Sequence, residues 1–158
     1  MASSVQNKQP SQLLVGIDVG STTAKIAVMD AASHKVLMRR YVRHHAQQAN
    51  CLKSLLAELD QRFEGIPMRA ALCGSGGAAL AEALDLPYVQ EVVANSLAVG
   101  ANYPTARTAI ELGGQDAKMI FFKFDNEANC LSVADMRMNG SCAGGTGAFI
   151  DEIATLLK

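Results

Sequence analysis

Apolar residues recur along the chain with two spacings, and the change from one spacing to the other predicts the order of the elements. Three runs rich in Val, Ile and Leu, joined by short polar turns, predict strands over residues 13–18, 24–29 and 35–42. Leucines at helical spacing then predict an amphipathic helix over residues 47–63. The chain therefore opens with a three-stranded meander followed by a helix.

The remainder of the chain alternates strands and helices and restarts after a turn-rich break at residues 102–106. Before the break we expect four elements: a strand over residues 69–73, a helix over 77–84, a brief strand over 88–91 and a helix over 92–101. After it we expect strands over residues 107–112, 117–124 and 130–138, then a helix that Thr146 can cap, with Phe149, Ile150, Ile153 and Leu157 on one face. This order predicts an α/β fold.

Two of the predicted hairpins carry the same polar residues in their turns. The stretches are "GIDVGSTTAKIAVMD" and "TAIELGGQDAKMIFF". In each, an acid (Asp18 or Glu111) ends the first strand and a lysine (Lys25 or Lys118) begins the second. Matching hairpins in two halves of a chain predict that a ligand lies between them.

The turn residues have the chemistry of a phosphate site, because a glycine-containing turn exposes backbone N–H groups and hydroxyls add donors. The candidate donors are Gly20, Ser21, Thr22, Thr23, Gly113 and Gly114. Asp18 and Glu111 can hold the water shell of Mg²⁺. Gln115 or Asp116 can position an attacking water, since phosphoryl transfer needs alignment and charge neutralisation. For either hairpin alone, a plain structural turn is the alternative.

A third glycine-rich stretch, "CGSGGAA", places Gly74, Gly76 and Ala79 between a strand and a helix in a G-x-G-x-x-A pattern. Such a pattern occurs in dinucleotide-binding folds. That fingerprint normally follows the first strand of its fold, whereas three strands precede it here. We therefore favour a tight strand-to-helix turn at the floor of a cleft.

Composition narrows the function classes. Fourteen basic and fifteen acidic residues leave a formal charge of −1, so no global field favours nucleic acid or an anionic membrane. The local cluster "RRYVRHH" is more typical of a solvated strand end, and adjacent His44 and His45 point to opposite faces of a strand. No apolar run approaches the ~18 residues of a membrane helix, and residues 1–12 resemble a disordered leader, not a signal peptide. We expect a cytoplasmic protein with neither nucleic-acid nor membrane partners.

The four cysteines lie far apart and form no C-x-x-C pair, which argues against a zinc ribbon or a disulfide scaffold. Cys51, Cys73 and Cys130 fall within predicted elements and are interpreted as structural. Cys142 lies in a glycine-rich loop just before a helix, where the helix dipole favours a thiolate. That position suits a nucleophile or a metal ligand, and a buried structural cysteine is the alternative.

At this point the motifs "GIDVGSTTAK", "ELGGQDAKMI" and "NGSCAGGTGAFIDEIA" resemble those of the ATP-dependent activators of 2-hydroxyacyl-CoA dehydratases and benzoyl-CoA reductases. This family belongs to the acetate and sugar kinase, heat-shock chaperone and actin superfamily, and the resemblance spans roughly residues 13–157. It implies two ribonuclease H-like domains that close on Mg-ATP. Residues 13–104 would form the first domain and residues 105–158 the truncated beginning of the second.

The resemblance also implies a redox role. In the family, a homodimer shares one [4Fe–4S] cluster, and ATP hydrolysis drives a low-potential electron into an acyl-CoA dehydratase or reductase. Cys142 matches the first cluster ligand, and the second would lie beyond residue 158. By themselves, therefore, these residues are expected neither to hold a full cluster nor to hydrolyse ATP well.

Two departures from the family pattern keep other functions open. Glu111 stands where the family usually has Asp, and Ala148 replaces a basic residue that often follows the glycine-rich loop. The longer acid could displace the magnesium shell and weaken hydrolysis. The alternatives are a nucleotide-sensing regulatory module that has lost turnover, and a small-molecule kinase of the same superfamily.

Overall fold

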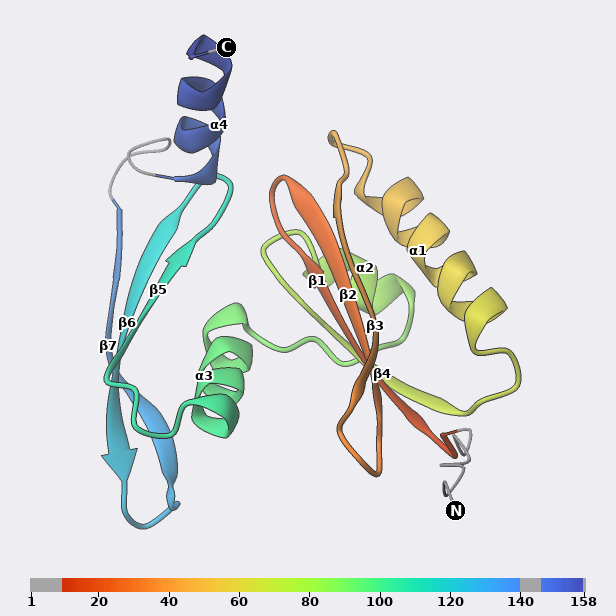
Figure 1. Ribbon diagram of the computed structural model, residues 1–158, viewed down its shortest axis with the longest axis horizontal. Coiled ribbons are helices and arrows are strands. Elements are labelled where there is room, and N and C mark those ends of the chain that lie inside the picture. The colour runs from red at the N-terminus through yellow and green to blue at the C-terminus, as the bar shows by residue number, and fades with distance from the viewer. Residues whose placement is uncertain (1–9, 140–145, 158) are drawn as a thin grey trace, which may run out of the picture.

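A computed structural model describes residues 10–139 and 146–157, and it contains two sheets that lie side by side (Figure 1). The first sheet is formed by β1 (Leu13–Val19), β2 (Thr23–Asp30), β3 (Val36–Arg43) and β4 (Met68–Cys73) in the order β3-β2-β1-β4. The strands β1 to β3 form the antiparallel meander expected from the sequence, and β4 pairs parallel to β1. The sheet is therefore mixed.

One face of the first sheet is covered by α1 (Gln48–Arg62), which lies along it in Figure 1. Alternate residues of β1 point into this interface, and the helix contributes three leucines at helical spacing. The fully or almost fully buried members are Leu13, Val15, Ile17, Val19, Leu52, Leu55 and Leu59. Burial of each such side chain stabilises the fold by about 1.5–3 kcal/mol, so this layer is the main core.

Between β4 and β5 the chain forms α2 (Ala78–Ala83), whose Ala81 joins the core of the first sheet, and α3 (Glu91–Asn102), which lies between the two sheets (Figure 1). The expected brief strand over residues 88–91 is wrong. Only Tyr88 forms a bridge, parallel to Leu72, because Gln90 is already the N-cap residue of α3 and Glu91 is the first residue of that helix. The extended segment therefore ends before residue 90, where α3 begins.

The second sheet contains β5 (Thr108–Leu112), β6 (Ala117–Asp125) and β7 (Cys130–Met138), all antiparallel and in chain order. Its small core consists of Ile120, Phe122 and Leu131. Val92 and Val99 of α3 pack against this core. The helix α3 therefore packs on the second sheet and turns its other side toward the first.

The last helix, α4 (Gly147–Leu156), begins at the tip of the second sheet (Figure 1). Thr146 is its N-cap residue, as predicted, but its buried hydroxyl makes no capping hydrogen bond. Backbone carbonyls replace it: the N–H groups of Gly147 and Ala148 donate to the carbonyls of Gly113 and Gly114 at 2.9 and 3.1 Å. The predicted apolar residues of α4, from Phe149 to Leu157, are all at least 40% exposed.

Candidate functional site

The two predicted hairpin turns have the same construction. In the β1–β2 turn, the N–H of Gly20 donates to the carbonyl of Thr23 at 2.9 Å. In the β5–β6 turn, the N–H of Gly113 donates to the carbonyl of Asp116 at 2.8 Å. The two hairpins that resemble each other in sequence therefore also have turns with the same hydrogen bond.

Each turn leaves backbone donors free. Across residues 10–139 and 146–157, no hydrogen bond uses the N–H groups of Ser21 and Thr22 in the first turn. The same holds for Gly114 and Gln115 in the second turn. Unpaired N–H groups that follow one another in a tight turn form a concavity suited to an oxyanion.

The two turns touch, although they lie about ninety residues apart in the sequence. A Cβ atom placed on Gly114 would lie only 2.7 Å from Thr22 Cγ2 and 3.1 Å from Thr22 Cβ. A larger residue at position 114 would therefore separate the turns. The structure thus brings together the phosphate-site candidates Gly20, Ser21, Thr22 and Thr23 of one hairpin with Gly113, Gly114, Gln115 and Asp116 of the other.

Acids and lysines of both hairpins form a charged cluster beside these turns. In the first hairpin, Lys25 Nζ lies 2.5 Å from Asp18 Oδ2 across the β1–β2 ladder. Burial alone would lower the pKa of Lys25, but the hydrogen bond and charge of Asp18 outweigh it and raise that pKa. The other oxygen, Asp18 Oδ1, is buried and has no hydrogen-bond partner. It is the free acceptor that a cation or its water shell would need.

In the second hairpin, Lys118 Nζ lies 2.6 Å from Glu91 Oε2 and 3.7 Å from Glu111 Oε2. Burial, together with the hydrogen bond and charge of Glu91, raises the pKa of Glu111. Burial also acts to raise the pKa of Glu91, but the hydrogen bonds from Lys118 and Glu111 reverse the shift and lower it. The two shifts are opposite, so Glu111 takes up a proton at a higher pH than Glu91 does.

Sequence reasoning missed Glu91. It is the first residue of α3, where an acid ordinarily stabilises the helix dipole and carries no further information. Only the folded chain places its carboxylate against Lys118 and Glu111. An acid four residues after Pro87 and directly before an apolar helix is the one signal that could have indicated Glu91.

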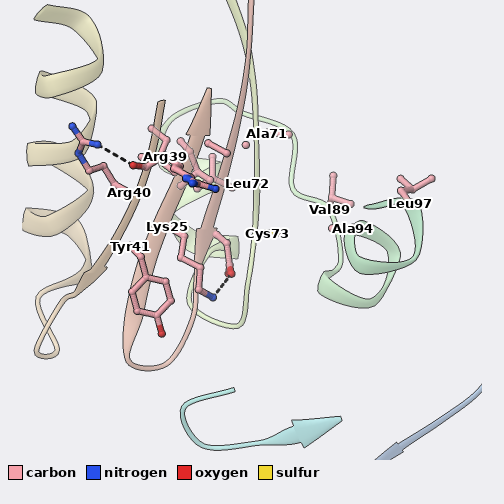
Figure 2. A pocket seen from close by; sticks show the side chains of 15 residues that line it. Lys25, Arg39, Arg40, Tyr41, Ala71, Leu72, Cys73, Val89, Ala94 and Leu97 are labelled. Carbon is pink, nitrogen blue, oxygen red and sulfur yellow. Dashed lines mark hydrogen bonds and ion pairs between the residues drawn. The ribbon is translucent and has the colours of Figure 1, made fainter. Parts of the chain in front are cut away.

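A cavity of about 740 Å³ opens next to the first charged pair, between the uncovered face of the first sheet and α3 (Figure 2). Its floor is a row of small residues paired across three strands: Ala27, Gly16 and Ala71. Ala94 and Leu97 of α3 form the opposite wall, and Asp18, Lys25 and Cys73 line one end. The volume lies within the usual range for small-molecule sites.

The thiol of Cys73 belongs to this end of the cavity and stays protonated. Burial, reinforced by the negative charges of Asp18 and Glu91, raises the pKa of Cys73 to about 11. Cys73 is therefore an inert structural thiol at neutral pH, as the sequence indicated.

The "CGSGGAA" stretch forms the tight strand-to-helix turn that the sequence favours, and two of its glycine N–H groups bind protein carbonyls. The N–H of Gly76 donates to the carbonyl of Val19 at 2.8 Å, and that of Gly77 to the carbonyl of Gly74 at 3.0 Å. Gly74 adopts φ +93°, and a Cβ there would lie 2.6 Å from the carbonyl carbon of Val19. The turn instead packs against the strand that carries Asp18.

Cys142 and the rest of its loop lie outside the described residues. Cys51 is on α1, Cys73 ends β4 and Cys130 begins β7, as predicted. In the part of the chain that the structure describes, no group of three His, Cys, Asp or Glu side chains could hold a metal ion by itself. The helices of that part are too short or too polar to cross a membrane.

Comparison with known proteins gives the same family as the motifs. Residues 15–158 match the BadF/BadG/BcrA/BcrD ATPase family. Over 145 residues the chain is 26% identical to the (R)-2-hydroxyglutaryl-CoA dehydratase activating ATPase of Acidaminococcus fermentans, which covers 91% of this chain and 53% of that protein. The chain thus spans about half the length of the curated relative.

Solved structures agree on the fold. The crystal structure of (R)-2-hydroxyglutaryl-CoA dehydratase component A from Acidaminococcus fermentans superposes with a TM-score of 0.72 at 25% identity, covering 93% of this chain and 54% of that one. The activator of 2-hydroxyisocaproyl-CoA dehydratase from Clostridium difficile, solved with bound ADPNP, superposes with a TM-score of 0.68 at 24% identity. The match covers 92% of this chain and 52% of that one. The expected ribonuclease H-like, actin-like α/β fold is confirmed.

Proposed function

This chain belongs to the BadF/BadG/BcrA/BcrD ATPase family, and on that premise we propose that it forms the phosphate-binding part of an ATPase that activates an acyl-CoA dehydratase or reductase. The observation that carries the proposal is the contact between two turns of the same construction, each with unpaired N–H groups and an acid–lysine pair beside it. A relative of the same fold was solved with bound ADPNP, a nucleoside triphosphate analogue.

We assign the phosphates to the two turns. The N–H groups of Ser21 and Thr22 would receive phosphate oxygens from one side, and those of Gly114 and Gln115 from the other. Lys25 adds a positive charge whose counter-ion, Asp18, is already in place. The adenine and ribose would bind to parts of the protein outside these residues.

We assign the magnesium shell to Asp18 and Glu111, with Glu91 as a further acid. The donor set fits Mg²⁺, a hard cation that binds through carboxylates and water. The buried, unpartnered Asp18 Oδ1 is an acceptor that such a shell would satisfy. Bound Mg²⁺ would neutralise the charge that develops on the transferred phosphoryl group. Gln115 or Asp116 would orient the attacking water.

Redox coupling is the remaining part of the proposal and rests on the family resemblance. Cys142 would be one of two ligands that each subunit of a homodimer gives to a shared [4Fe–4S] cluster, in a cytoplasmic protein whose first domain ends near residue 104. Three of the relatives are activators of CoA dehydratases, which supports a partner of that class.

The test uses the intact protein, purified without oxygen. We expect Mg²⁺-dependent ATP hydrolysis that Asp18→Asn lowers at least tenfold, because the substitution removes the charge facing the cation. We also expect iron and acid-labile sulfide in wild type but not in Cys142→Ser. If the wild-type protein hydrolyses ATP but contains no iron, the proposed electron transfer is refuted. If it neither hydrolyses ATP nor contains iron, the proposed ATPase function is refuted as well.

A nucleotide-sensing module is a second candidate, favoured by one observation. Lys118 Nζ lies 3.7 Å from Glu111 Oε2, and the neighbouring Glu91 raises the pKa of Glu111, so the carboxyl of Glu111 faces groups of its own half of the site. If this pairing persists with nucleotide bound, the protein would bind ATP but hydrolyse it slowly. Tight ATP binding with turnover that Glu111→Asp restores would identify this case.

A further inference from the structure

His44, which lies directly after β3, is almost fully buried and is not explained by the core or by the charged cluster. Its side chain is 4% exposed. The Nε2 atom of His44 lies 3.0 Å from the carbonyl oxygen of Gly20, and the backbone N–H of His44 donates to the carbonyl of Thr22 at 3.2 Å. One residue thus binds the carbonyls on both sides of Ser21, in the first phosphate turn.

The hydrogen bond fixes the tautomer of the ring. A carbonyl oxygen only accepts, so Nε2 must carry the proton and donate it. The other ring nitrogen, Nδ1, is buried and has no hydrogen-bond partner. The only hydrogen bond of the imidazole within the described residues is therefore the one to Gly20.

This bond also orients a donor of the phosphate site. In a trans peptide the carbonyl of Gly20 and the N–H of Ser21 belong to one plane and point in opposite directions. Because His44 holds the Gly20 carbonyl, the Ser21 N–H points away from the imidazole, and no group among residues 10–139 and 146–157 accepts a hydrogen bond from it. A flipped peptide would present a carbonyl oxygen to the phosphate instead.

The position needs such a restraint because glycine is the residue whose backbone turns most freely. A Cβ on Gly20 would meet only the Thr23 carbonyl, at 3.6 Å, so packing around this residue does not hold the peptide. The loop after His44 is itself fixed: Gln47 N–H donates to the His44 carbonyl at 2.8 Å, and His45 and Ala46 adopt φ of 48° and 62°. We propose that His44 is a positioning residue that locks the Gly20–Ser21 peptide in its phosphate-binding orientation.

The proposal rests on the proposed function, and the test separates the two. Dissociation constants for Mg-ATP and for adenosine, which lacks phosphates, are measured by calorimetry on the intact protein together with its melting temperature. The variants are His44→Ala, His44→Gln and the control His45→Asn. His45 is exposed, and Asn tolerates its left-handed backbone.

We expect His44→Ala to weaken ATP binding about tenfold, the effect of losing one oriented hydrogen bond, and to leave adenosine binding unchanged. His44→Gln places an amide N–H near the position of Nε2 and should recover most of the affinity. His45→Asn should match wild type. Parallel losses for ATP and adenosine, or equal ATP affinity in His44→Ala and His45→Asn, would overturn the positioning role. A wild type that binds ATP no better than adenosine would refute the phosphate site, and the proposal with it.

Discussion

The contact between the two turns can be tested by adding one methyl group to Gly114. In Gly114→Ala the new Cβ would lie 2.7 Å from Thr22 Cγ2, whereas carbon atoms in contact prefer about 3.5–4.0 Å. Threonine is branched at Cβ and stiff, so rotation of its side chain cannot remove the clash. The turns must therefore separate by about 1 Å.

A displacement of that size matters because phosphoryl transfer depends on alignment. We expect kcat/KM for ATP hydrolysis by the intact protein to fall about 100-fold, the usual effect of a misplacement of about 1 Å. The melting temperature should change little, since the clash lies between two surface turns and not in either core. Steady-state ATPase kinetics and thermal unfolding together measure both effects.

Gly16→Ala is the matched control, because no atom lies within 4 Å of a Cβ at that position. Thr22→Ser in the Gly114→Ala background should restore part of the activity, because serine lacks Cγ2 and its hydroxyl can rotate away. If Gly114→Ala and Gly16→Ala behave alike, the two turns do not act on the same ligand, and the reasoning fails.

Two further predictions concern titratable groups near the site. Because the pKa of Glu111 is raised in the folded state, its contribution to stability is full at low pH and is lost as pH rises through that pKa. Glu111→Gln should therefore raise the free energy of unfolding at pH 7 by roughly 1 kcal/mol, with no gain at pH 4. Urea unfolding at both pH values tests this against exposed Glu152→Gln, and a gain of equal size at pH 4 would contradict it. The pKa of Cys73 is raised to about 11, so iodoacetamide at pH 8 should alkylate Cys73 at least ~100-fold more slowly than exposed Cys130. Peptide mass spectrometry follows both reactions. Equal rates would show that the Cys73 thiol is neither buried nor beside the acids.

Hydrophobic periodicity predicted most elements because strands and helices here bury one face each. The strand expected over residues 130–138 has those bounds in the structure, and the helix expected over 47–63 covers Gln48–Arg62. The two hairpins were found as a repeat because each register pairs an acid with a lysine, Asp18 with Lys25 and Glu111 with Lys118.

What the sequence could not predict depends on contacts between distant segments. The function of Glu91 was hidden because an acid at a helix start has a local explanation, and its partners are 20 and 27 residues away. Thr146 lost its capping role because carbonyls of the β5–β6 turn reach the start of α4 first. His44 was dismissed as part of a solvated basic stretch, since nothing local indicates that it folds under the first turn.

The pairing of charges within each half has a consequence for how the two sheets can move. Asp18 and Lys25 belong to the first sheet and neutralise each other. Glu91 and Lys118 form an ion pair in the body made up of α3 and the second sheet, where the pKa of Glu111 is raised.

One exposed ion pair, between Arg43 of β3 and Asp151 of α4, joins the two halves directly. Separating the halves would break this pair and leave both side chains in water, and because exposed ion pairs contribute only about 0–1 kcal/mol, the electrostatic cost of opening is small. A charged nucleotide entering the cleft would add a second electrostatic link between the halves.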